Sequence, residues 1–147
     1  MSGGINVEDF CKDAARALVI LYRTFPRPHT LFVEDLCGPD QVDEFGMHSD
    51  RHLACFSALL WLAAEGYLRY TDTIRQEAVD QAVLTGRAFT LLSRPLADFE
   101  PPGAESLPPA VRLEQQTHAH RLDLALDSRS STRVKTAVLA FMDDMLG

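Results

Sequence analysis

The sequence has few of the residues on which several classes of site depend. Three cysteines occur among 147 residues, and Cys11, Cys37 and Cys55 form no CxxC pair, so neither a disulfide framework nor a zinc ribbon is expected. We interpret them as small core side chains. A glycine-rich phosphate loop, a GxSxG elbow and an HExxH motif are also absent. We therefore predict a non-catalytic protein without a cofactor.

Long apolar runs and an excess of positive charge are missing as well. The longest stretch of apolar or small residues, 53–64, is too short to cross a bilayer, and MSGGINVEDF at the start has no signal region. These absences predict a cytoplasmic protein with no membrane partner. Lys and Arg number 14 against 21 Asp and Glu, a net charge of −7. That balance opposes non-specific attraction to phosphate backbones.

What the chain does contain is enough apolar sequence for a core, with 46% hydrophobic and 24% charged residues. Apolar residues recur at helical spacing through 53–64, and a helix so apolar must be covered from several directions. We expect it to be the central helix. Asp50 is predicted to cap its start, and Gly66 to end it in the left-handed conformation.

The other expected elements are set by apolar periodicity and by prolines. Pro26 ends a first amphipathic helix, and Thr85 is predicted to cap a short helix near the end of the first two thirds. The full set is a helix to residue 25, a strand 30–33, a helical turn 33–37, a polar connection 39–49, strands 67–73 and 78–84, and a helix 86–92.

The C-terminal third has a different composition. Residues 94–109 contain five prolines and are predicted to form a semi-rigid linker. A helical extension, 110–147, should follow, with a first helix over 110–127. Its last helix has an apolar face, which either packs on the chain's own domain or pairs with its copy in a dimer. Four residues of that face are candidate interface residues: Val134, Phe141, Met142 and Met145.

The order of elements over residues 6–93 resembles a winged-helix domain. LLWLAAEGYLRY at 59–70 is similar to the end of a recognition helix in that family, and AVLTGRAFTLL at 82–92 to the step after the wing. The resemblance implies a mostly α, α+β fold. Residues 1–93 would form a winged-helix core with a small two- or three-stranded β-wing. Such domains serve DNA regulators and protein adaptors alike.

The resemblance also implies that the main helix and the wing would contact DNA. The candidate DNA-contacting residues are Ser49, Arg51, His52, Arg69 and Arg75. Residues 34–50, however, contain six acids and no Lys or Arg, which raises the cost of approaching a duplex. We therefore predict a regulatory module that binds a protein partner or forms a homodimer, and the alternative is a DNA-binding transcription regulator. Trp61 is either a core residue or an anchor for a partner.

A metal site can be drawn near the start of the main helix. His48 and His52 are four residues apart, and Asp43, Glu44 and Cys55 are close in sequence. Spacing identifies no third ligand. The prediction is therefore surface or structural histidines and no metal.

Overall fold

The computed structural model describes residues 4–147; residues 1–3 of the predicted first domain lie outside this range. The described chain is mostly helical, with a small antiparallel sheet, which confirms the α+β class. No helix in it is both long and apolar enough to cross a membrane. The helices are α1 (Ile5–Thr24), α2 (Val33–Cys37), α3 (Asp50–Ala64), α4 (Gly86–Ser93), α5 (Pro109–Gln115), α6 (His118–Ser128) and α7 (Ser131–Leu146).

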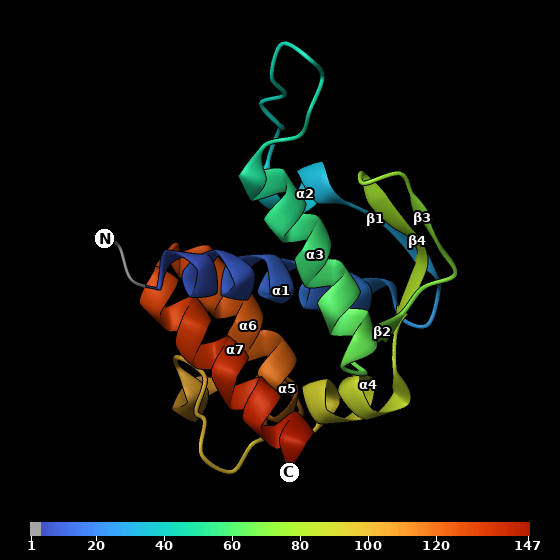
Figure 1. Cartoon of the computed structure of the whole chain (residues 1–147). Coiled ribbons are helices and arrows are strands. Elements are labelled where there is room, and N and C mark those ends of the chain that lie inside the picture. The colour runs from blue at the N-terminus through green and yellow to red at the C-terminus, as the bar shows by residue number, and fades with distance from the viewer. Residues whose placement is uncertain (1–3) are drawn as a thin grey trace.

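The four strands all belong to one sheet in which β4 is the common partner. They are β1 (His29–Phe32), β2 (Leu68–Arg69), β3 (Asp72–Ile74) and β4 (Ala78–Leu84), and the first three each pair antiparallel with β4. The sheet lies beside α3, and its hairpin β3–β4 is at the edge of the molecule (Figure 1).

The expected strand 67–73 is in fact two strands, β2 and β3. Their partner β4 is irregular at Gln81, which has a φ of 53°. The pairing with β1 also shifts there, since His29 faces Ala82 and Leu31 faces Val79. Relative to β1, β4 therefore has one extra residue, which is a local bulge. The register of β4 with β2 and β3 does not change. The prediction of one strand over 67–73 was wrong because residues 70–71 belong to neither β2 nor β3.

Helix α3 begins and ends almost where the sequence predicts. Gly66 has a φ of 83°, as expected for its left-handed role. The cap at the start, however, is Ser49 and not Asp50, because the Ser49 hydroxyl accepts a hydrogen bond from the His52 amide at 3.1 Å. Ser49 has the extended backbone that a cap requires, whereas Asp50 is already helical.

The expected helix 110–127 is also divided, into α5 and α6. Thr117 begins the second helix, because its hydroxyl accepts a hydrogen bond from the His120 amide. The Gln116 carbonyl, which precedes it, accepts a hydrogen bond from the Leu96 amide at 2.6 Å. The proline-rich segment thus contacts the break between the two helices.

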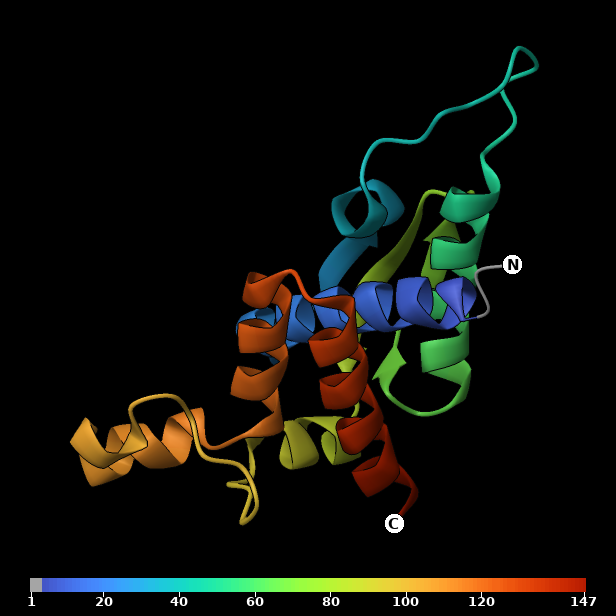
Figure 2. The same ribbon diagram turned by 90° about the vertical axis from the view of Figure 1, so that its left-hand side faces the viewer.

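Helix α1 runs through the middle of the molecule. Helices α6 and α7 cover one side of it, and α3 crosses it on another (Figures 1 and 2). Buried side chains of α1, α3, the sheet, α6 and α7 belong to one hydrophobic cluster. Residues 118–142 therefore contribute to the same core as the first two thirds of the chain.

Candidate functional site

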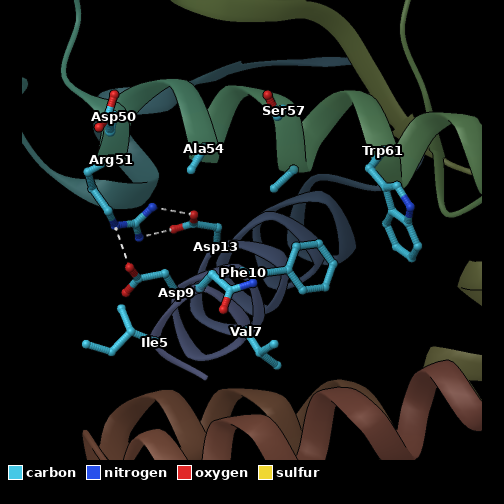
Figure 3. Close-up of a pocket in the computed structure, with 12 residues that line it drawn as sticks. Ile5, Val7, Asp9, Phe10, Asp13, Asp50, Arg51, Ala54, Ser57 and Trp61 are labelled. Atoms are coloured by element: carbon cyan, nitrogen blue, oxygen red, sulfur yellow. Dashed lines mark hydrogen bonds and ion pairs between the residues drawn. The ribbon is translucent and has the colours of Figure 1, made fainter. Parts of the chain in front are cut away.

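A groove with a volume of about 720 Å³ lies between α1 and α3 (Figure 3). Its floor is formed by small residues of α3, namely Ala54, Ser57 and Ala58. Larger side chains from both helices stand at its two ends. The remaining lining residues are Ile5, Asn6, Val7, Asp9, Phe10, Asp13, Asp50, Arg51 and Trp61.

Two pairs of large side chains hold the helices apart around this floor. At one end Arg51 of α3 meets Asp13 of α1, and at the other Trp61 of α3 meets Phe10 of α1 (Figure 3). Between these pairs, Ala54 and Ser57 are too short to fill the space. The distance between two helices depends on the side chains at their contact. Large side chains at both ends of this contact and small ones between them therefore leave an open groove.

The apolar end of the groove is made by Trp61, whose residue surface is 44% exposed. Its ring makes an edge contact with Phe10, with 5.3 Å between centroids, and lies nearly parallel to Tyr67 at 6.0 Å. The ring is therefore held in one orientation without being covered. Trp61 was predicted to be either a core residue or an anchor for a partner, and in the structure it is at the surface.

The polar end is an ion pair surrounded by further acids. Both terminal nitrogens of Arg51 donate to the Asp13 carboxylate, at 2.6 and 2.7 Å, and Asp9 lies 3.7 Å from its Nε. The hydrogen bonds with Asp13 hold the pKa of the Arg51 guanidinium above its ordinary value. Exposed Asp50 is next to it. Asp13 and Asp9 thus contact the guanidinium, and Asp50 also lines this end of the groove. Three carboxylates against one cation make this end negative.

The outward face of α3 carries no cation. The exposed residues between 50 and 64 follow a spacing of three and four and form one stripe: Asp50, Ala54, Ser57, Trp61 and Ala64. Ser57 and the Trp61 indole are its only hydrogen-bond donors. This face is apolar along most of its length and acidic at its start.

Three of the five predicted DNA contacts are engaged within the chain. Arg51 is paired with Asp13, and Ser49 both caps α3 and donates its hydroxyl to Asp40 at 2.6 Å. His52 is 1% exposed, and its Nε2 donates to the Gln76 carbonyl at 2.7 Å. These side chains therefore stabilise the start of α3 through bonds within the chain.

The other two predicted contacts, Arg69 on β2 and Arg75 in the β3–β4 turn, are exposed. Arg75 has a left-handed φ of 51° and lies beside exposed Glu77. The structure does not bring either arginine into the groove between α1 and α3.

The predicted interface residues of α7 are mostly internal. Val134, Phe141 and Met142 are buried, and Met145 is partly buried against the same core. The Phe141 ring contacts Tyr67 and His118. The alternative in which α7 packs on its own domain is the one this structure has, because α1 and α4 already cover its apolar face.

Sequence reasoning missed the contribution of α1 to the groove. Asp9, Phe10 and Asp13 have the spacing of an ordinary amphipathic helix, and Asp13 is 1% exposed. Its partner Arg51 is 38 residues away in the chain. The one available signal was an acid on the apolar side of a helix, which requires a partner when buried.

A scan against protein-family models and searches of curated proteins and of solved structures all found no significant match. The chemistry of the groove is therefore inferred from its own residues. Among the described residues that line it, the only hydroxyl is that of Ser57, and no histidine stands beside it. An apolar floor, a fixed indole and an acidic end suit binding.

Proposed function

We propose that this chain is a winged-helix module that binds a helical segment of a partner protein in the groove between α1 and α3. The observation that carries the proposal is the open, cation-free face of α3. In a winged-helix DNA binder this face would read bases and need donors. Here it offers alanine, serine and tryptophan.

Element order and strand pairing support the winged-helix assignment. Helix, strand, two helices and a hairpin follow one another from α1 to β4, and β1 pairs with the last strand of the hairpin. Under this assignment α3 is the recognition helix and β3–β4 is the wing. A helix-in-groove partner is one of the recurrent modes of peptide recognition.

The charges of the groove select the kind of partner. The partner segment should place apolar side chains over Ala54 and Ser57 and against Trp61. Its Lys or Arg side chains should lie at the end near Asp9 and Asp50, where carboxylates outnumber the single guanidinium. Complementary charges at the rim favour encounter and fix the direction of the segment.

A synthetic helix-forming peptide with leucines on one face and lysines at one end tests the proposal. Trp61 is the only tryptophan of the chain, so binding should shift the protein's tryptophan emission to shorter wavelength as the indole is covered. The same peptide with glutamates in place of lysines is the control for charge. The glutamate peptide should bind more weakly than the lysine peptide, and the difference in affinity should grow as the salt concentration falls.

A matched pair of variants tests whether the groove is the binding site. Ala54→Arg places a long cation on the groove floor, whereas Ala110→Arg makes the same change at an exposed position of α5. We expect Ala54→Arg to reduce peptide affinity by at least about tenfold, or about 1.4 kcal/mol. Ala110→Arg should leave it unchanged. Equal effects of the two variants would contradict the proposal.

The DNA alternative is tested with a fluorescent duplex in low salt. We expect no binding. Binding that falls steeply with salt and is lost in Arg75→Gln would favour the transcription regulator instead. A concentration-dependent dimer that Ala54→Arg abolishes would make the occupant of the groove a second copy of the chain.

A further inference from the structure

The segment between α2 and α3 projects from the body of the molecule (Figures 1 and 2). Three side chains from the two ends of this segment and the start of α3 form a cluster. Asp40 is at the beginning of the segment, His48 is near its end, and His52 is in the first turn of α3. One metal-ligating atom from each residue lies within 4.8 Å of those of the other two. These residues are separate from the groove between α1 and α3.

The orientation of His52 leaves an unused lone pair in this cluster. Its side chain is 1% exposed, and Nε2 must be the protonated nitrogen because it faces the Gln76 carbonyl at 2.7 Å. In the neutral ring Nδ1 is then the unprotonated nitrogen. That atom is buried, has no hydrogen-bond partner, and lies 3.5 Å from Oδ2 of Asp40. A buried lone pair facing a carboxylate oxygen calls for a positive charge between them.

His48 and His52 both face the same oxygen of Asp40. His48 Nδ1 lies 2.6 Å from Asp40 Oδ2, and the His48 and His52 rings are stacked nearly parallel, with centroids 4.0 Å apart. Because an imidazole lone pair lies in the plane of its ring, the more exposed His48 must turn out of this stack to bind the same ion as His52. The second oxygen of Asp40 accepts from the Ser49 hydroxyl and amide.

We propose that Asp40, His48 and His52 bind a divalent transition-metal ion of the zinc class, with water as a further ligand. Two imidazoles and one carboxylate are a zinc-type donor set. Ligand atoms in a tetrahedral zinc site are about 3.4 Å apart, given bonds of about 2.0–2.1 Å. The distance of 3.5 Å between Asp40 Oδ2 and His52 Nδ1 is already close to this value. Binding replaces the shorter His48–Asp40 hydrogen bond.

The surroundings are those that a ligand set requires. A histidine ligand usually donates its other ring nitrogen to a carbonyl or carboxylate, as His52 does to Gln76, and a ligating carboxylate is itself hydrogen-bonded, as Asp40 is to Ser49. His48 has 22% of its side chain exposed, so the position for the water ligand is on the solvent side of the cluster. The sequence-based prediction of no metal lacked a third ligand, and the fold supplies Asp40.

Calorimetric titration of the chelator-treated full chain with Zn²⁺ tests this site. We expect one equivalent to bind. Asp40→Asn and His48→Gln should each weaken binding by at least about tenfold, whereas His120→Gln, outside the cluster, should have no effect. Circular dichroism of each metal-free variant shows that it is folded. Amide hydrogen exchange in 40–49 should slow when Zn²⁺ is added to the parent chain.

Three results would overturn the assignment. The first is no uptake of Zn²⁺ by the parent chain. The second is uptake that His48→Gln and Asp40→Asn leave intact. The third is uptake lost in Cys37→Ser, which would place the ion on a thiol. None of these results bears on the peptide groove.

Discussion

Helix α1 has two sides that meet their neighbours in different ways. On the side that faces α7 it has small, fully buried residues, as Cys11 and Ala15 are. On the side that faces α3, the Asp13–Arg51 and Phe10–Trp61 pairs leave a groove between them. In this molecule, small residues allow close packing on one side of α1, whereas large side-chain pairs keep α3 at a distance on the other.

The common core that closes around α1 should give the largest response to mutation. Phe141 of α7 is fully buried and contacts Tyr67 and His118. Phe141→Ala should lower the free energy of unfolding by about 3–5 kcal/mol, because it leaves a cavity in the common core. Chemical denaturation measures this change. A loss below about 1 kcal/mol would mean that α7 is not part of that core.

The second-largest effect is expected for the ion pair between Asp13 of α1 and Arg51 of α3. Asp13→Asn leaves the Arg51 guanidinium beside a neutral amide in a partly buried position, and we expect a loss of about 2–3 kcal/mol. The double variant Asp13→Leu with Arg51→Met should recover most of it, since apolar residues then replace the whole pair. Equal stability of the single and double variants would show that the pair is not coupled.

The same substitution on the two sides sharpens the comparison most directly. Ala15 is buried one helical turn after Cys11 and lies on the same face of α1. Lys135 of α7 is close enough to Cys11 to oppose the rise that burial causes in the pKa of that thiol, so this face of α1 meets α7. Ala15→Leu should therefore overpack the closed side and cost about 1–3 kcal/mol. Ala54→Leu, on the groove floor, should change stability by less than about 0.5 kcal/mol. Thermal unfolding of both variants checks the difference, and equal losses would mean that the groove is closed in solution.

Local signals in the sequence predicted most helices well. Pro26 after α1, Gly66 after α3 and the Thr85 hydroxyl before α4 each act through neighbours only a few residues away. Such signals need no tertiary context, because a cap or a stop is complete within one turn of chain. The break between β2 and β3 at residues 70–71 has no such local signal, so periodicity within 67–73 did not reveal it.

The fate of the predicted DNA donors shows why residue type alone misled. Arg51 and His52 lie at the start of α3, and their residue types led to the prediction that they contact DNA. Their partners, Asp13 and Gln76, are 38 and 24 residues away. A donor is available to a ligand only when nothing inside the fold uses it, and spacing in the sequence contains no such information.

The amino-acid sequence by itself determined that the protein is acidic, with no surplus of cations, and that it has a central apolar helix and amphipathic flanking helices. Composition and helical periodicity are local properties, so they needed no fold to be visible. Only the tertiary structure decided which side of α1 closes and which stays open, and only it brought Asp40 beside His48 and His52. Both depend on side chains that meet across the fold, where packing and charge pairing act regardless of distance along the chain.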